Sequence, residues 1–216
     1  MPRVNSVLKA RKSPGTCGKC GKKIQKGNPY IHWKFRYGGK RIRCAECPRP
    51  RQSELTNSDK LSRCYAAGEA IADAIESFRK DGELEDLRSA LESAAEEIRE
   101  VAQEYRESAD NVESGMNGNR MPICDELEEK ADNLEGKADD IEQAAGGLED
   151  FDEDQAKEEA ETEAGEEMAE EEGDKVEKDD SAFDAKVEEI LKSKKDDWIE
   201  EQVSQVDEYT DISPEG

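Results

Sequence analysis

The chain has 216 residues, of which 33% are apolar and 41% are charged, and its formal net charge is −24. This composition excludes one large hydrophobic core, so we expect one or two small domains in an extended or partly disordered chain. The charge is unevenly divided: residues 1–65 hold 17 Lys and Arg against 3 Asp and Glu, and residues 66–216 hold 15 against 53. Such a division indicates two oppositely charged partners, an acidic tail that screens a basic head, or solubility alone.

The compartment follows from what the chain lacks and from its cysteines. No run reaches the about 18 consecutive apolar residues of a membrane helix. The first residues, "MPRVNSVLKARKSPG", lack the apolar centre of a signal peptide. We therefore expect a cytoplasmic protein with no membrane association. Four of its six cysteines stand in two C-x-x-C pairs, a pattern that in this compartment indicates metal binding instead of disulfides.

After a basic arm over residues 1–16, residues 17–52 are predicted to form a small zinc ribbon or finger. Two C-x-x-C pairs supply four thiolates for a tetrahedral zinc ion, and all four ligand positions are then filled, so the zinc is expected to be structural. The ligands are Cys17, Cys20, Cys44 and Cys47. A redox dithiol is the alternative, but the turn-rich "GKKIQKGNPY" replaces the helix that such a site needs.

Between the cysteine pairs, "YIHWKFRYGGKRIRC" alternates with a period of two and turns at its two glycines, which predicts a β-hairpin. One face, with Ile31, Trp33, Phe35 and Tyr37, is expected to cover the metal, and the other is expected to be basic. The candidate nucleic-acid-binding residues are His32, Lys34, Arg36, Lys40, Arg41 and Arg43. Two alternatives stay open: the aromatic residues form only a small core, and His32 is a metal ligand.

Residues 53–148 are predicted to be helical. A first helix is expected over 58–80, capped by Ser53 or Ser58. Residues 83–113 and 123–148 each carry apolar residues at alternating steps of three and four, and the turn "SGMNGNRMP" separates them. This pattern predicts an antiparallel coiled-coil hairpin, or a homodimer through the same helices. Because the seams are rich in alanine, we expect them to recruit the first helix or a second chain.

Residues 149–182 contain 18 acids and 3 lysines, and we expect a disordered acidic linker because so little of it can be buried. It is long enough to fold back on the basic module and compete with phosphate. An amphipathic helix over 183–206 and a tail over 207–216 follow. The expected fold is thus a four-cysteine zinc finger, a mainly α-helical hairpin and a disordered acidic tail.

Catalytic machinery is not visible in the sequence. His32 is the only histidine, and no paired carboxylates mark a pocket, so we expect a protein that is not an enzyme. Cys64 and Cys124 lie outside the four predicted ligands. They are interpreted as buried small residues, with a disulfide or a modification site at Cys124 as the alternative.

Two resemblances add to these expectations. The order C-x-x-C, "IQKG", an aromatic strand, "GGK" and a second cysteine pair resembles the poly(ADP-ribose) polymerase-type zinc finger, which binds DNA breaks. That family uses Cys-Cys-His-Cys, and Cys44 stands where the family has histidine. The resemblance implies the same four cysteine ligands and no catalytic residue. The segments "SELTNSDKLSRCYAA" and "YRESADNVESG" resemble small proteins of tailed phages and prophages, which implies a host cytoplasm and an accessory role.

The expected function is therefore a non-enzymatic adaptor. Its finger is expected to bind DNA, RNA or an acidic protein surface, and its helices a protein partner. The alternative is an acidic nucleic-acid mimic that occupies a basic groove of a host protein.

Overall fold

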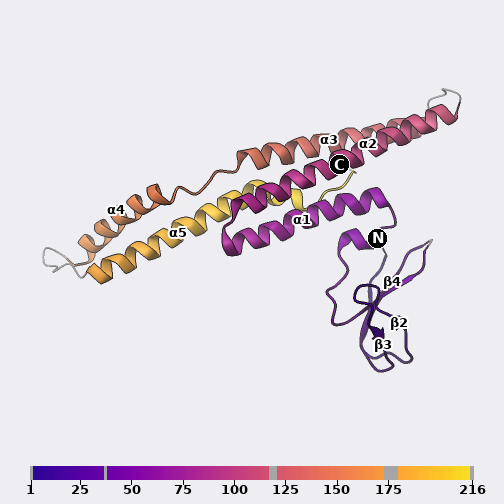
Figure 1. Cartoon of the computed structure of the whole chain (residues 1–216), viewed down its shortest axis with the longest axis horizontal. Helices are drawn as coiled ribbons and strands as arrows, with labels where there is room; N and C mark the ends of the chain where they lie inside the picture. Colours follow the sequence, from indigo (N-terminus) through magenta and orange to yellow (C-terminus); the bar gives the residue numbers. More distant parts are fainter. Residues whose placement is uncertain (1, 37, 117–120, 173–179, 215–216) are drawn as a thin grey trace.

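The computed structural model describes residues 2–36, 38–116, 121–172 and 180–214. A small β module at the N-terminus is followed by five helices, which agrees with the predicted fold class in its coarse form. Figure 1 shows the helices as a long rod, from the side of which the β module projects.

The β module contains two small sheets. The hairpin strands β4 (Tyr30–Lys34) and β5 (Lys40–Cys44) pair antiparallel, and β1 (Asn5–Val7) pairs with the other edge of β4. The predicted basic arm therefore contributes a strand. The second sheet consists of β2 (Gly15–Thr16) and β3 (Lys23–Ile24), which flank the first cysteine pair.

A short 3₁₀ helix, η1 (Gln52–Leu55), connects the β module to the first long helix, α1 (Asp59–Asp81). Ser58 caps α1, because its side chain accepts a hydrogen bond from the backbone N–H of Leu61. Gly82 ends the helix in the left-handed conformation with φ of +71°.

The centre of the rod is a hairpin of α2 (Leu84–Gly115) and α3 (Pro122–Gly147). The two helices run antiparallel, since Arg99 contacts Asp139 and Arg106 contacts Asp132. The apolar seam residues of both helices are buried within one chain together with residues of α1. The alanine-rich seams thus gain the additional apolar surface that they need from the first helix.

The prediction of a disordered linker over 149–182 requires correction, because α4 spans Glu153–Glu172. Three alanines spaced four residues apart, Ala156, Ala160 and Ala164, are buried along this helix. Ala160 and Ala164 pack against Val187 and Ile190 of α5 (Asp180–Val206). The small side chains allow close helix packing, and the acids occupy the remaining faces. Residues 173–179 of the predicted linker lie outside the described residues.

The second half of α5 returns to the main core, where Ile199, Val203 and Val206 are buried. The chain then forms η2 (Asp207–Thr210), and Ile212 is buried in the same core. A Cβ atom at Gly68 of α1 would lie 2.6 Å from the carbonyl oxygen of Thr210. Glycine lowers helix propensity, but at this position it makes room for the C-terminal segment.

Within the described part of the chain, no helix combines the length and the apolar character that crossing a membrane requires.

Candidate metal centre and basic module

The four predicted ligand cysteines lie together in the β module. Their sulfur atoms all fall within 4.8 Å of one another, with Cys20 and Cys44 3.6 Å apart, Cys44 and Cys47 3.5 Å apart, and Cys17 and Cys47 3.9 Å apart. A tetrahedral zinc ion with Zn–S bonds of about 2.3 Å holds its sulfurs about 3.8 Å apart. The spacing of the cluster therefore fits such an ion, and all four cysteines are free of disulfides.

Backbone turns bring each pair of sulfurs to the same point. The backbone N–H of Cys17 donates to the carbonyl of Lys22, and that of Gly21 donates to the carbonyl of Cys17, which closes a turn between β2 and β3. Gly21 has φ of +70°, a conformation that favours glycine. The second turn follows β5, where the N–H of Cys47 donates to the carbonyl of Cys44.

Two of the clustered thiols, Cys17 and Cys47, have pKa values shifted in opposite directions. Burial raises the pKa of Cys17, but hydrogen bonds from the backbone N–H groups of Cys20, Cys44 and Lys19 outweigh it, and the pKa is lowered to about 6. The pKa of Cys47 is raised to about 12, chiefly by its hydrogen bond with Cys44 and then by burial. Since a metal needs thiolates, it must displace the protons that the cluster retains.

The face of the hairpin that covers the cysteines is not the predicted one. Tyr30 is paired with Cys44, so it shares the face of that cysteine, and Tyr30, Ile42 and Ile24 pack around the cluster. Ile31 and Trp33, which alternate with Tyr30 along β4, are buried on the opposite face. The alternation was correctly predicted, but the sequence did not show which face meets the cysteine cluster, and Tyr37 of the predicted face lies outside the described residues.

The basic residues of the hairpin lie on both of its faces, because successive side chains of each strand point to opposite faces. Lys34 and Lys40 are partners across the strands on the cysteine side, whereas Arg41 pairs with Trp33 on the other. These three side chains and Arg36 are exposed. His32 is half-buried beside the Tyr30 ring, 5.7 Å between centroids, and is not part of the cysteine cluster.

Arg43 differs from the other predicted binding residues, because it is 3% exposed. Its guanidinium donates to the carbonyl of Pro48 at 2.9 Å and forms an ion pair with Glu54 of η1. It lies over the Trp33 ring, 5.6 Å from the centroid. Arg43 therefore belongs to the interior of the module and does not extend the exposed basic surface.

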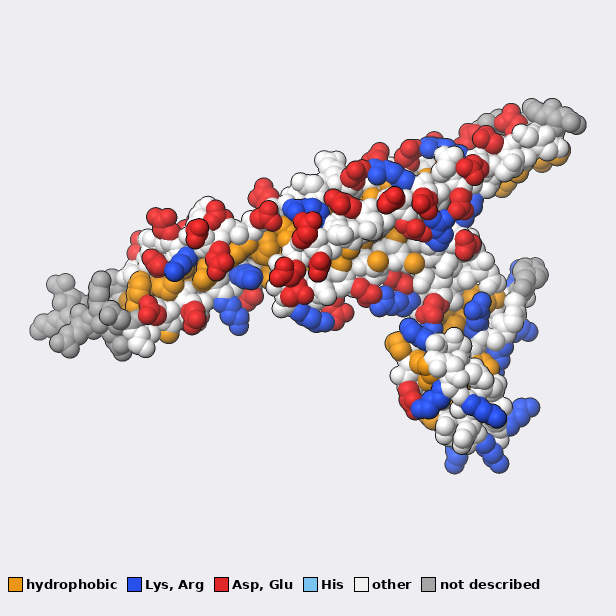
Figure 2. All heavy atoms as spheres, in the orientation of Figure 1, with side chains coloured by type: hydrophobic (Ala, Val, Ile, Leu, Met, Phe, Trp, Pro, Cys, Tyr) orange, Lys and Arg blue, Asp and Glu red, His pale blue; other side chains and the backbone are white. Residues whose placement is uncertain are grey.

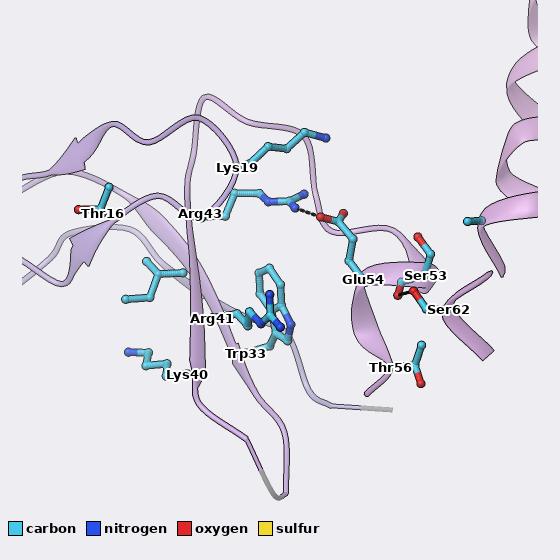
Figure 3. Close-up of a pocket in the computed structure, with 13 residues that line it drawn as sticks. Thr16, Lys19, Trp33, Lys40, Arg41, Arg43, Ser53, Glu54, Thr56 and Ser62 are labelled. Atoms are coloured by element: carbon cyan, nitrogen blue, oxygen red, sulfur yellow. Dashed lines mark hydrogen bonds and ion pairs between the residues drawn. The ribbon is translucent and has the colours of Figure 1, made fainter. Parts of the chain in front are cut away.

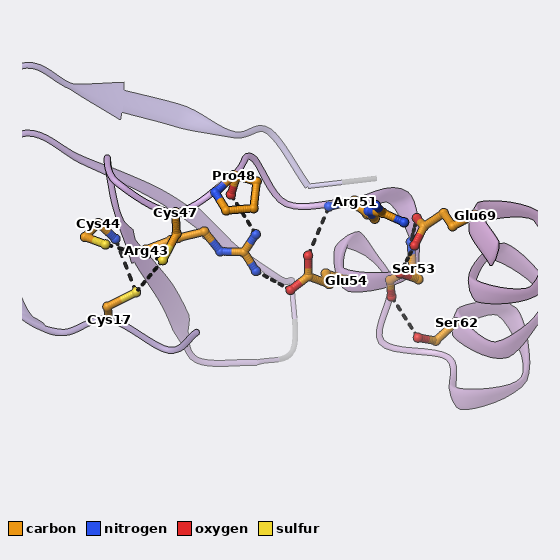
Figure 4. A network of polar contacts seen from close by, with 10 residues as sticks. All are labelled: Cys17, Arg43, Cys44, Cys47, Pro48, Arg51, Ser53, Glu54, Ser62 and Glu69. Atoms are coloured by element: carbon orange, nitrogen blue, oxygen red, sulfur yellow. Dashed lines mark hydrogen bonds and ion pairs between the residues drawn. The ribbon is translucent and has the colours of Figure 1, made fainter. Parts of the chain in front are cut away.

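Glu54 begins a polar network that joins the β module to α1 (Figure 4). It accepts from the backbone N–H of Arg51, whose guanidinium donates to both carboxylate oxygens of Asp73 at 2.6 and 2.8 Å. The backbone N–H and hydroxyl of Ser53 donate to Glu69 at 2.9 and 2.6 Å. We define these contacts, from Arg43 to Asp73 and Glu69, as the junction. Sequence reasoning missed it, because nothing in the local pattern links Arg43 to Glu54.

The remaining two cysteines are buried in the helical rod and form no disulfide. Burial raises the pKa of the Cys64 thiol to about 11, and Cys124 lies 3.7 Å from the carbonyl of Ala109, to which it donates. Both therefore have the buried environment expected of small core residues.

No protein-family model, curated protein or solved structure matches the chain.

Proposed function

We propose that the chain is a non-enzymatic adaptor in which a structural zinc ion organises the β module, the module binds nucleic acid, and the helical rod engages a protein. The observation that carries this proposal is the separation of charge in space. In Figure 2, Lys and Arg gather on the β module, and Asp and Glu predominate along the rod.

The β module offers an almost purely cationic surface. Every Lys and Arg in residues 2–50 is exposed except Arg43. The one acid in this range, Glu46, pairs with Lys22 at 2.6 Å. A surface of this kind attracts the phosphates of a nucleic acid and releases their counterions.

The hairpin aromatics favour phosphate contact over base stacking. Trp33 and Phe35 are buried, and Tyr30 is half-buried with the Lys40 ammonium 5.4 Å from its ring centroid. With these rings engaged inside the module, binding relies on cations, so it is expected to be tolerant of sequence and sensitive to salt.

The test is binding of the full zinc-loaded chain to labelled duplex DNA, single-stranded DNA and RNA across a salt series. The variant Lys26→Gln/Lys34→Gln removes two exposed cations of the module. It is expected to lower the slope of log K against log salt by about one for each lysine that contacts a phosphate. Lys192→Gln removes an exposed lysine of α5 and should leave the slope unchanged. Absence of binding at moderate salt, or equal loss in both variants, would contradict the proposal.

A second candidate function, nucleic-acid mimicry, is favoured by α4. A mimic needs carboxylates at fixed positions, and the acids of 153–172 lie on a helix that packs against α5. On this candidate, the chain displaces a labelled duplex from DNA-binding proteins that have a basic groove. Glu158→Gln/Glu161→Gln, which neutralises two exposed acids of α4, should weaken the displacement, and Lys26→Gln/Lys34→Gln should not. The opposite ranking would leave the adaptor as the better description.

A further inference from the structure

A cavity of about 460 Å³ lies between the β module and the start of the helical rod (Figure 3). The β side of its wall includes Lys19, Trp33, Arg41 and Arg43, and the η1 side includes Glu54. Its volume is within the range of about 300 to 1,000 Å³ that is usual for small-ligand sites.

Two buried donors in this wall have no acceptor among the described residues. They are Trp33 Nε1 and Arg43 Nε, on side chains that are 4% and 3% exposed. Buried N–H groups are nearly always paired, because an unpaired one loses its hydrogen bonds to water and gains nothing in return. Both side chains extend from the strands toward η1 in Figure 3. The position of the two nitrogens calls for an acceptor supplied from outside the chain.

The charges around the cavity define the acceptor. Lys19 and Arg41 are exposed lining residues, and Arg43 is buried in the wall. Glu54 is the one acid in the lining, and it is already bound to Arg43 and to the backbone N–H of Arg51. The site is therefore cationic and rich in donors, which suits an anion with several acceptor oxygens.

An anion can reach the two nitrogens only if side chains of the cavity wall move. Neither nitrogen is open to solvent as the structure stands. Arg41 is the cross-strand partner of Trp33, lines the same cavity and is exposed, so it can swing outward readily. In the bound state, its guanidinium would then pair with the anion.

We propose that this cavity binds a phosphate monoester group. Trp33 Nε1 and Arg43 Nε donate hydrogen bonds to the phosphate oxygens, and Arg41 closes over the group from the solvent side. The phosphate can be the end of a nucleic-acid strand or belong to a small phosphorylated metabolite. The proposal does not depend on the nucleic-acid function, since it rests on the two buried donors and Arg41 in this cavity and not on binding of a nucleic acid to the rest of the module.

The first experiment follows the tryptophan indole N–H resonances of the full zinc-loaded chain by NMR. The chain has two tryptophans, and Trp198 serves as an internal control because its Nε1 already donates to the carbonyl of Glu149 at 3.0 Å. Inorganic phosphate, a nucleoside 5′-monophosphate, a 5′-phosphorylated oligonucleotide and its 5′-hydroxyl counterpart are titrated at matched ionic strength. We expect a saturable shift of the Trp33 resonance with phosphate-bearing ligands alone.

The pattern of responses identifies the source of the phosphate. A shift with phosphate and mononucleotide supports a small-molecule site, and a shift with the phosphorylated oligonucleotide alone supports a strand end. An unmoved Trp33 resonance with all four ligands at millimolar concentration would overturn the proposal, as would equal shifts with the 5′-hydroxyl oligonucleotide.

Substitution then tests the donors, with affinity measured by calorimetry for the ligand that shifts Trp33. Trp33→Phe keeps an aromatic ring and removes the N–H, and it should weaken binding at least about tenfold. The same substitution at Trp198 is the matched control and should leave affinity unchanged. Arg41→Gln alters an exposed side chain, so it tests the site even if Trp33→Phe disturbs the fold, and it should also weaken binding about tenfold. Unchanged affinity in Arg41→Gln and in a folded Trp33→Phe would overturn the proposal.

The two proposals can fail separately. Salt-dependent binding of 5′-hydroxyl DNA without a shift of the Trp33 resonance would support the nucleic-acid function and contradict the phosphate site. A Trp33 shift with inorganic phosphate in a chain that does not bind DNA retains the site and removes the function.

Discussion

At the scale of single residues, the ion pair of Arg43 with Glu54 allows a charged arginine to be buried inside the β module. The Arg43 side chain is 4% exposed and that of Glu54 is 37% exposed, so the arginine bears most of the desolvation and the carboxylate offsets it. Burial raises the pKa of Glu54, but its hydrogen bonds with the Arg43 guanidinium and the Arg51 backbone N–H outweigh burial, and the net shift is downward.

This shift gives a prediction about acid stability. A carboxyl whose pKa is lower in the folded chain contributes stability above its unfolded value of about 4.3, and the contribution is lost as pH falls through the folded value. We expect Glu54→Gln to lower the free energy of unfolding of the module by about 1 to 3 kcal/mol at pH 7, after allowance for the exposure of Glu54. The difference from the unsubstituted chain should shrink below about pH 4.3.

Denaturant unfolding of both chains in the Trp198→Phe background at several pH values, followed by Trp33 fluorescence, measures this difference. Zinc loss in acid affects both chains, so their difference isolates Glu54. The control is Glu46→Gln, which breaks an exposed pair with Lys22 and should change stability by at most about 1 kcal/mol. A Glu54→Gln effect that is the same at every pH would exclude the proposed linkage.

At the scale of elements, the helical structure of α4 depends on the spacing of its alanines, which its overall composition does not reveal. Its acids give it the composition of a disordered segment, but every fourth position from Ala156 to Ala164 is a buried alanine. The helix is therefore stabilised by packing on α5, and a charge in the alanine stripe should separate the two.

Ala160→Glu tests this dependence, since Ala160 is completely buried against α5. We expect the amides of α4 to lose protection from hydrogen exchange, because a carboxylate cannot be desolvated in that seam. Ala182→Glu adds the same side chain at an exposed position of α5 and should leave α4 protected. Unchanged protection in Ala160→Glu would show that α4 is helical without α5.

The sequence predicts some elements well and others poorly for physical reasons. The four clustered cysteines and the seams of α2 and α3 were predictable, because each depends on spacing within one local segment. The pairing of α4 with α5 joins two separate segments, and only Ala156, Ala160 and Ala164 indicated it. The face of the hairpin that meets the cysteine cluster depends on the pairing of Tyr30 with Cys44, which alternation alone does not determine.

At the scale of the whole molecule, the chain contains two units, the β module and the helical rod, with separate buried clusters. The buried cluster around the cysteines is small, with Cys17, Ile24 and Cys44 at its centre, and the other face of the hairpin adds only a few buried side chains such as Ile31 and Trp33. The rod has a continuous apolar core of its own that includes residues of α1, α2, α3 and α5. Metal binding of about 10 to 16 kcal/mol would therefore be the main support of the first unit and irrelevant to the second.

Chelation should accordingly unfold one unit and spare the other. In the Trp198→Phe chain, removal of metal should shift the emission of Trp33 toward that of an exposed indole while far-UV circular dichroism retains the helical signal. Cys44→Ser should have the same effect without chelator. Retention of one zinc per chain in folded Cys44→Ser would contradict the four-cysteine site.

The junction also limits how the β module can be oriented relative to α1. Because Arg51 binds Asp73 and Ser53 binds Glu69, the β module cannot swivel freely on α1 as a bead on a tether would. The 32 residues of α2 run for about 48 Å from the end of α1, back along α1 to where Lys60 contacts Glu104, and on to Gly115. A molecule bound to the β module and another bound near the C-terminal end of α2 would thus be held at a fixed separation and a fixed angle by the chain itself.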